Sequence, residues 1–112
     1  MKIYHNPRCS KSRQGLSFLE ELNQSFEVIE YLKTPITFDE LSEIITLLKI
    51  APIELVRKNE QLWKDNFKGK QLSDPEIIQA MIDNPKLIER PIVVHNSKAV
   101  IGRPTDLINT VL

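Results

Sequence analysis

The segment "YHNPRCSKSR", residues 4–13, contains the only cysteine of the chain, Cys9, surrounded by cationic and hydroxyl side chains. A thiol close to arginine or lysine loses its proton more readily than a free cysteine, and its thiolate is a nucleophile. Arg8, Lys11 and Arg13 could supply this positive charge. The same cations bind oxyanions. The loop is therefore suited to a thiolate that attacks a tetrahedral anion.

The spacing around Cys9 argues against several other thiol sites. A cysteine phosphatase has a C-x5-R loop, but the position that needs arginine is occupied by Gly15. A dithiol of the C-x-x-C type needs a second cysteine where this chain has Ser12. Cys9 with two distant histidines, His5 and His95, is a poor set of zinc ligands, so we expect no metal.

Length and composition limit the class of protein. A chain of 112 residues is long enough for one compact domain with its own core. Because 15 Lys and Arg balance 15 Asp and Glu, we expect neither nucleic acid nor membrane as a partner. No apolar run approaches the roughly 18 residues of a membrane span, and no signal-peptide pattern is present. We expect a cytoplasmic monomer, because a lone cysteine suits a reducing compartment.

Apolar periodicity predicts a β-α-β unit around the cysteine. The pattern favours a strand at Lys2–Tyr4, a helix over about 12–23 and a second strand at Phe26–Leu32. In open sheets of this kind, reactive groups lie beyond the carboxyl ends of the strands, where a loop enters a helix. Cys9 falls at that point, and the unpaired amides of the first helical turn would stabilise its thiolate.

The rest of the chain predicts a helical block and a second part of the sheet. The capping boxes "TFDE" at 37–40 and "SDPE" at 73–76 open two helices within a block of about 37–84. Two apolar runs over 90–102 predict an antiparallel hairpin around Asn96-Ser97, and a last helix follows. We therefore predict an α/β, thioredoxin-like fold, β-α-β plus β-β-α, with a helical insertion between the halves of a single domain.

Four segments, in this order, resemble the glutaredoxin-coupled arsenate reductases, a family with the thioredoxin fold. They are "IYHNPRCSKSR" at 3–13, "LVRKN" at 55–59, "ERPIVV" at 89–94 and "GRPTDLI" at 102–108. Some members of the family have Cys-Gly-Thr-Ser-Arg where this chain has Cys-Ser-Lys-Ser-Arg, so that Lys11 adds a charge to the loop.

The resemblance implies a role for particular residues of this chain. Cys9 is the expected nucleophile, and the arginines that bind the anion are expected to be Arg57, Arg90 and Arg103. The supporting residues are those of the first loop and the family's cis-proline before the third strand: His5, Ser12, Arg13 and Pro91. Arginine suits the binding role because its planar fork grips oxyanions with two hydrogen bonds and always carries its charge.

The resemblance also implies the reaction. The thiolate would attack As(V) in arsenate and expel water or hydroxide, which leaves a covalent thiol–arsenate adduct. The chain has no second cysteine, so the next sulfur must come from another molecule. The family implies glutathione as co-substrate and glutaredoxin as reductant, with arsenite released and no tightly bound cofactor.

Two other functions stay open. A glutathione-dependent thiol transferase with a different substrate would use the same cysteine. A redox-responsive regulator of this fold that binds RNA polymerase also has a cysteine loop and an Arg-Pro-Ile segment. Many such regulators have a C-x-x-C pair and lack the arginine of "GRP", so Ser12 and Arg103 argue against that function.

Overall fold

The computed structural model describes residues 1–112, which form two compact units. The first unit comprises Met1–Thr34 and Arg90–Leu112, and the second comprises Pro35–Glu89. The helical block predicted for about 37–84 falls within the second unit. That the two units make up a single domain stays a prediction. Every helix is too short or too polar to cross a membrane.

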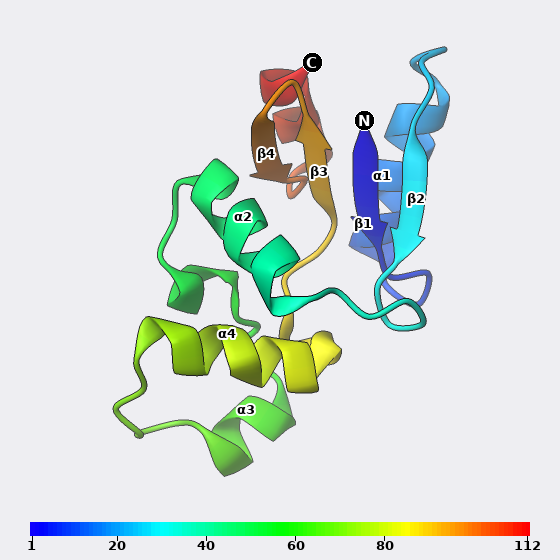
Figure 1. Cartoon of the computed structure of the whole chain (residues 1–112). Coiled ribbons are helices and arrows are strands. Elements are labelled where there is room, and N and C mark those ends of the chain that lie inside the picture. Colours follow the sequence, from blue (N-terminus) through cyan, green and yellow to red (C-terminus); the bar gives the residue numbers. More distant parts are fainter. The chain divides into compact units, whose positions relative to one another are not determined.

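A four-stranded sheet in the order β2-β1-β3-β4 organises the first unit (Figure 1). Its strands are β1 (Lys2–His5), β2 (Glu27–Glu30), β3 (Ile92–His95) and β4 (Lys98–Ile101). β2 runs parallel to β1, whereas β3 is antiparallel to both β1 and β4. Helix α1 (Ser10–Glu20) joins β1 to β2, and the helical segment η3 (Thr105–Val111) follows β4. The predicted thioredoxin-like fold, β-α-β plus β-β-α, is confirmed.

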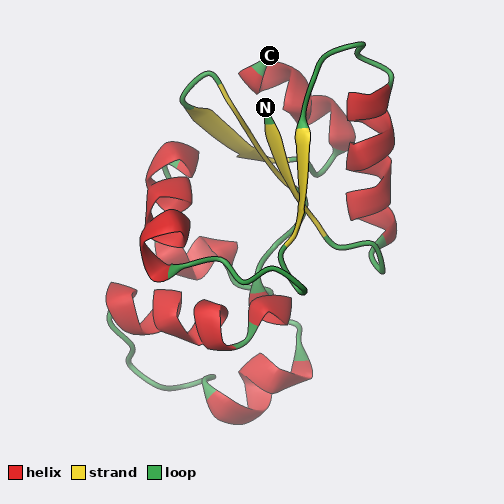
Figure 2. Cartoon of the chain, turned by 45° about the vertical axis from the view of Figure 1, so that its right-hand side comes forward, coloured by secondary structure: helices red, strands yellow, loops and turns green.

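The core of this unit lies between the sheet and its two helical segments, α1 and η3 (Figure 2). Ile3 of β1 and Val93 of β3 are partners in the register, so their side chains point to the same face. They pack with Leu19 of α1 and with Ile108 and Val111 of η3, and all of these are buried. The core fixes α1 against the strands, and it thereby fixes the loop that joins β1 to α1.

The ends of several elements differ from the prediction. Helix α1 spans Ser10–Glu20 rather than 12–23, because Cys9 already caps it and Asn23 adopts a left-handed φ of 55°. β2 is shorter at both ends than predicted. The last segment, Thr105–Val111, is a 3₁₀ helix rather than an α-helix.

The β3–β4 hairpin turns where the sequence predicts it. Asn96 and Ser97 have φ values of 54° and 58°. Positive φ at both central residues is the mark of a type I′ turn, whose twist matches that of the flanking strands.

The second unit is helical. Its elements are α2 (Phe38–Leu48), η1 (Pro52–Leu55), α3 (Gln61–Asn66), α4 (Asp74–Asp83) and η2 (Pro85–Leu87). At the start of α2 the hydroxyl of Thr37 accepts a hydrogen bond from the amide of Glu40. At α4, Ser73 and Glu76 form a reciprocal capping box, as predicted. α2 packs against α4, and both contribute buried apolar residues.

Pro91, immediately before β3, is packed between two glycines of the first unit. A Cβ atom added to Gly15 of α1 would lie 2.7 Å from Cγ of Pro91. A Cβ atom added to Gly102, just after β4, would lie 3.3 Å from the same atom. The absence of side chains at these glycines therefore lets α1, the start of β3 and the end of β4 come together.

We expect Gly15→Val to destabilise the protein by about 2 kcal/mol or more, because overpacking a buried site costs roughly 1–3 kcal/mol. Valine gains little helix propensity over glycine, so the gain does not offset this cost. Unfolding in guanidinium chloride, followed by circular dichroism, measures the change. Ser17→Val, at an exposed position of the same helix, is the control. Equal loss of stability in both variants would contradict a specific role for the contact with Pro91.

Candidate active site

The loop between β1 and α1 is a turn held by its own side chains. The carbonyl of Asn6 accepts a hydrogen bond from the amide of Cys9 at 3.1 Å, with Pro7 at the second position of the turn. Oδ1 of Asn6 accepts another from the amide of Arg8 at 2.9 Å. Asn6 is not among the residues predicted for the site, although an Asn-Pro pair is a recognised turn signal.

Arg13, one of the predicted supporting residues, braces this turn from the first turns of α1. Its Nη1 donates a hydrogen bond to the carbonyl oxygen of Pro7 at 2.8 Å. The side chain is otherwise exposed. Arg13 thus helps to fix the loop that carries the cysteine.

Cys9 is the N-cap of α1, with an extended backbone conformation. Its thiol makes no capping hydrogen bond with the first turn, but the backbone amides of Ser12 and Lys11 are close enough to help lower its pKa. The first turn of α1 contains no acidic residue, in contrast to α2 and α4. No carboxylate of that turn therefore competes with a thiolate for the positive end of the helix.

Arg90 reaches Cys9 from the other end of the sequence. Its Nε donates a hydrogen bond to Sγ of Cys9 at 3.1 Å, and both residues are partly buried. Arg90 precedes Pro91, and the peptide bond between them is cis, as the resemblance implies. The structure thus places a predicted anion-binding arginine directly on the predicted nucleophile.

The pKa of Cys9 is lowered from its ordinary value. Burial by itself raises this pKa, but the polar groups around the sulfur outweigh the burial. These groups are the amide of Ser12, the guanidinium of Arg90 and the amide of Lys11. Each stabilises the thiolate more than the thiol. Because the thiolate is the reactive form, Cys9 is equipped to act as a nucleophile.

Ser12 is fully buried and links the loop to β1. Its Oγ accepts a hydrogen bond from the amide of Asn6 at 2.9 Å and lies 2.7 Å from Nδ1 of His5. Burial lowers the pKa of His5, although the nearby carboxylate of Glu30 acts in the opposite direction. His5 is therefore mostly neutral at about pH 7 and shares a hydrogen bond with Ser12 rather than adding a charge to the site.

Arg103 lies on the segment next to Pro91. The amide of Gly102 donates a hydrogen bond to the carbonyl of Pro91 at 2.9 Å, which holds the chain after β4 against the chain before β3. Arg103 is half-buried, and a second cis peptide bond, which the resemblance does not imply, joins it to Pro104. The first unit therefore brings the segments that carry Cys9, Arg90 and Arg103 together.

Arg57 belongs to the second unit and has its partners there. Its Nη2 lies 2.8 Å from Oε1 of Glu60, and its Nη1 donates a hydrogen bond to the carbonyl of Lys86 at 3.0 Å. Oε1 of Glu89 is 4.0 Å from its Nε. The guanidinium is thus held by two carboxylates, and its role in binding an anion stays a prediction.

The glycines around Pro91 are the other residues of the site that the predictions omit. Gly15 lies inside a helix, where glycine costs about 1 kcal/mol relative to alanine, so its presence there is a signal of close packing. Gly102 directly precedes Arg103 and has the same function at the end of β4. The chain contains no cluster of three or more His, Cys, Asp or Glu side chains able to hold a metal ion.

A thioredoxin-like sheet with a cysteine of lowered pKa at the start of its first helix, and an arginine hydrogen-bonded to the sulfur, defines a protein equipped for thiolate chemistry. Residues 4–111 match the ArsC family, and the chain belongs to that family.

Three similar proteins span nearly the whole chain. "Uncharacterized protein YfgD" of Escherichia coli (strain K12) is 50% identical over 108 residues, covering 95% of this chain and 91% of that protein. An "Arsenate reductase" of Neisseria meningitidis serogroup A is 43% identical over 114 aligned positions, covering 100% and 97%. The solved structure "Arsenate reductase from Vibrio cholerae" has a TM-score of 0.93 and 42% identity, covering 100% and 98%.

Proposed function

We propose that this protein is an arsenate reductase in which the thiolate of Cys9 attacks arsenate. The observation that carries the proposal is the 3.1 Å hydrogen bond from Nε of Arg90 to Sγ of a cysteine whose pKa is lowered. Similar proteins named arsenate reductase support the choice of substrate. Arsenate resembles phosphate, which carries roughly −1.5 to −2 charges near neutral pH, so positive charge is needed where it meets a thiolate.

In the first step, the sulfur of Cys9 donates an electron pair to As(V) and forms an S–As bond. An As–O bond breaks, and its oxygen leaves as water after taking up a proton. Nε of Arg90 holds the thiolate, and the other N–H groups of the same planar fork can bind an arsenate oxygen. Arg103 and Arg57 are proposed to bind the remaining oxygens and to reduce the repulsion between the two negative groups.

We infer that glutathione and glutaredoxin supply the reducing thiols, because the chain has a single cysteine. The sulfur of glutathione forms a second S–As bond, and another arsenic oxygen leaves as water. A glutaredoxin thiolate then attacks the glutathione sulfur. The electron pair of the S–As bond stays on arsenic, which becomes As(III), and the mixed disulfide is the oxidised product. Hydrolysis of the remaining S–As bond releases arsenite and frees Cys9. We propose that the protein acts as a cytoplasmic monomer without a tightly bound cofactor.

We expect arsenate-dependent oxidation of NADPH when the protein is mixed with glutathione, glutaredoxin and glutathione reductase. Cys9→Ser should reduce this turnover to the background rate, because the serine hydroxyl is not ionised near neutral pH. Ser25→Ala, an exposed serine of the same unit, is the control and should keep full turnover. If arsenate adds nothing while Cys9 reacts as a low-pKa thiolate, the reductase proposal is wrong and a glutathione-dependent thiol transferase fits better.

A further inference from the structure

Glu30, the last residue of β2, lies beside His5, the last residue of β1. The two residues are partners in the parallel register of these strands, so their side chains point to the same face of the sheet. Ile3, two residues before His5, packs against α1 on that face. Glu30 and His5 therefore both lie on the α1 side of the sheet, where β1 ends and the loop that carries Cys9 begins.

The hydrogen bonds of Ser12 indicate which nitrogen of His5 carries the proton. The hydroxyl of Ser12 is fully buried, so its single hydrogen needs an acceptor. Its oxygen already accepts a hydrogen bond from the amide of Asn6. Nδ1 of His5, 2.7 Å from Oγ, is placed to accept the hydroxyl hydrogen. A neutral imidazole has one N–H group, which this arrangement puts on Nε2.

The same series of hydrogen bonds continues to Cys9, because the carbonyl of Asn6 accepts a hydrogen bond from the amide of Cys9. A carboxylate, an imidazole and a serine also occur in this order in serine hydrolases. Ser12 is not such a nucleophile, because its hydroxyl is fully buried and its oxygen is bound to the amide of Asn6. The series therefore serves to hold the loop of Cys9.

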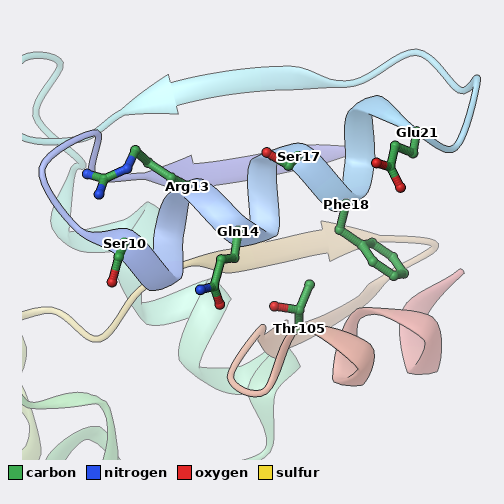
Figure 3. A pocket seen from close by; sticks show the side chains of 7 residues that line it. All are labelled: Ser10, Arg13, Gln14, Ser17, Phe18, Glu21 and Thr105. Carbon is green, nitrogen blue, oxygen red and sulfur yellow. The ribbon is translucent and has the colours of Figure 1, made fainter.

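The charges around His5 oppose one another. Burial has the largest effect and lowers the pKa of His5, the carboxylate of Glu30 raises it, and the guanidinium of Arg13 lowers it. Figure 3 shows Arg13 on the first turns of α1, beside the loop that follows β1. Nζ of Lys33 lies 3.5 Å from Oε1 of Glu30 and offsets part of its charge. Arg90, from the segment before β3, is engaged with the thiol.

We propose that Glu30 is a positioning residue that acts through His5. Its charge favours the proton on Nε2, the nitrogen that Ser12 does not use, and it sets the pH at which His5 takes up a second proton. In the imidazolium form Nδ1 becomes a donor, and the hydroxyl hydrogen of Ser12 loses its acceptor. The support of the Cys9 loop therefore changes with pH, whatever substrate the thiolate attacks.

NMR of the imidazole nitrogens of His5 in isotope-labelled protein tests this arrangement. At about pH 7.5 we expect the neutral ring with its proton on Nε2. On acidification the ring should gain a proton with a pKa below the ordinary value for histidine, because burial disfavours the charged form. The backbone amide signal of Asn6 should follow with the same midpoint, since the hydroxyl between the two groups changes its role.

Two neighbouring variants should shift this midpoint in opposite directions. Glu30→Gln should move it to lower pH, because the charge that favours the imidazolium is lost. Lys33→Met should move it to higher pH, because the carboxylate of Glu30 is no longer offset. A role in packing alone does not produce opposite shifts.

The controls are Glu27→Gln and Lys2→Met. Glu27 and Lys2 are exposed and are paired in the register of the same two strands, three residues before Glu30 and His5. These strands rise about 3.3 Å per residue, so the control charges lie roughly 10 Å further away, near the screening length of physiological salt. Both controls should leave the midpoint of His5 unchanged.

Thermal unfolding at about pH 7.5 and about pH 5.5 gives a second readout. A histidine whose pKa is lower in the folded than in the unfolded state makes stability fall as the pH drops below about 6.5. Because Glu30 raises the folded pKa of His5, Glu30→Gln should enlarge the loss of melting temperature at acid pH. Lys33→Met should reduce this loss.

The inference is overturned if the neutral ring of His5 carries its proton on Nδ1, or if Glu30→Gln leaves the midpoint of His5 unchanged. It is also overturned if the amide of Asn6 does not follow His5, or if the controls shift the midpoint as much as the variants do. None of these measurements uses arsenate, so the positioning role of Glu30 and the proposed reductase activity can fail separately.

Discussion

Arg90→Met is expected to raise the pKa of Cys9 and to slow its alkylation near neutral pH by about tenfold or more. Hydrogen bonds to charged groups contribute roughly 1.5–3 kcal/mol, and this variant removes the one from Nε to the sulfur together with the adjacent charge. Because the guanidinium lowers the pKa, its loss moves the alkylation profile toward higher pH. The amides of Ser12 and Lys11 remain, so the thiolate keeps part of its stabilisation and the pKa rises only partway toward its ordinary value.

The rate of reaction with iodoacetamide, measured against pH, gives the midpoint for each variant. Arg8→Met is the matched control, because Arg8 is an exposed cation of the same loop whose backbone amide, not its side chain, is hydrogen-bonded. Its midpoint should stay close to that of wild type. Turnover with arsenate should fall further than alkylation in Arg90→Met, because the same guanidinium is proposed to bind the substrate. An unchanged midpoint in Arg90→Met would show that the contact does not stabilise the thiolate.

The first loop could be predicted because its parts are local. A cysteine between a short strand and an amphipathic helix must lie near the helix N-terminus, and side chains within one helical turn of it are its neighbours. The positions of Cys9, Ser12 and Arg13 follow from that geometry. The fold class follows from the order of strands and helices, because a β-α-β unit and a terminal β-β-α unit fit one sheet in few ways.

Only the family resemblance predicts a place in the site for Arg90 and Arg103, since no periodicity links them to residue 9. Their positions depend on the sheet and on the packing of Pro91 between Gly15 and Gly102, which are far apart in the sequence. The type and the ends of individual helices also depend on how they pack against other elements. The last segment becomes a 3₁₀ helix while packed against α1 and β4, a choice that apolar spacing alone does not determine.

Arg57 illustrates a different limit of sequence reasoning. The resemblance predicts a role for this arginine, but the partners of its charge depend on the fold. Here Glu60 is three residues further along the chain, at the other end of a hydrogen-bonded turn, whereas Glu89 approaches through the pairing of Val56 with Ile88. These ion pairs set the guanidinium's position within the second unit, and the sequence pattern predicts neither.

Ser12→Ala is expected to destabilise the protein by about 3 kcal/mol and to lower its melting temperature by roughly 10 °C. The hydroxyl is fully buried. Its oxygen accepts a hydrogen bond from the amide of Asn6 and shares another with Nδ1 of His5, and both of these residues are buried as well. Alanine leaves these two groups without that partner, at roughly 1–3 kcal/mol for each unsatisfied group. Thermal unfolding followed by circular dichroism measures the loss. Alkylation of Cys9 should also slow, because the same loop positions its sulfur.

Ser17→Ala distinguishes the buried hydrogen bonds from an effect of alanine on the helix. Ser17 is exposed on α1 and its side chain has no hydrogen bond, so alanine there should raise stability by a few tenths of a kcal/mol through helix propensity. The same substitution on the same helix is therefore expected to act with opposite signs at the two positions. If Ser12→Ala also stabilised the protein, the hydroxyl would contribute nothing net. The loop around Cys9 would then have to be held by the turn at Asn6 and by Arg13 alone.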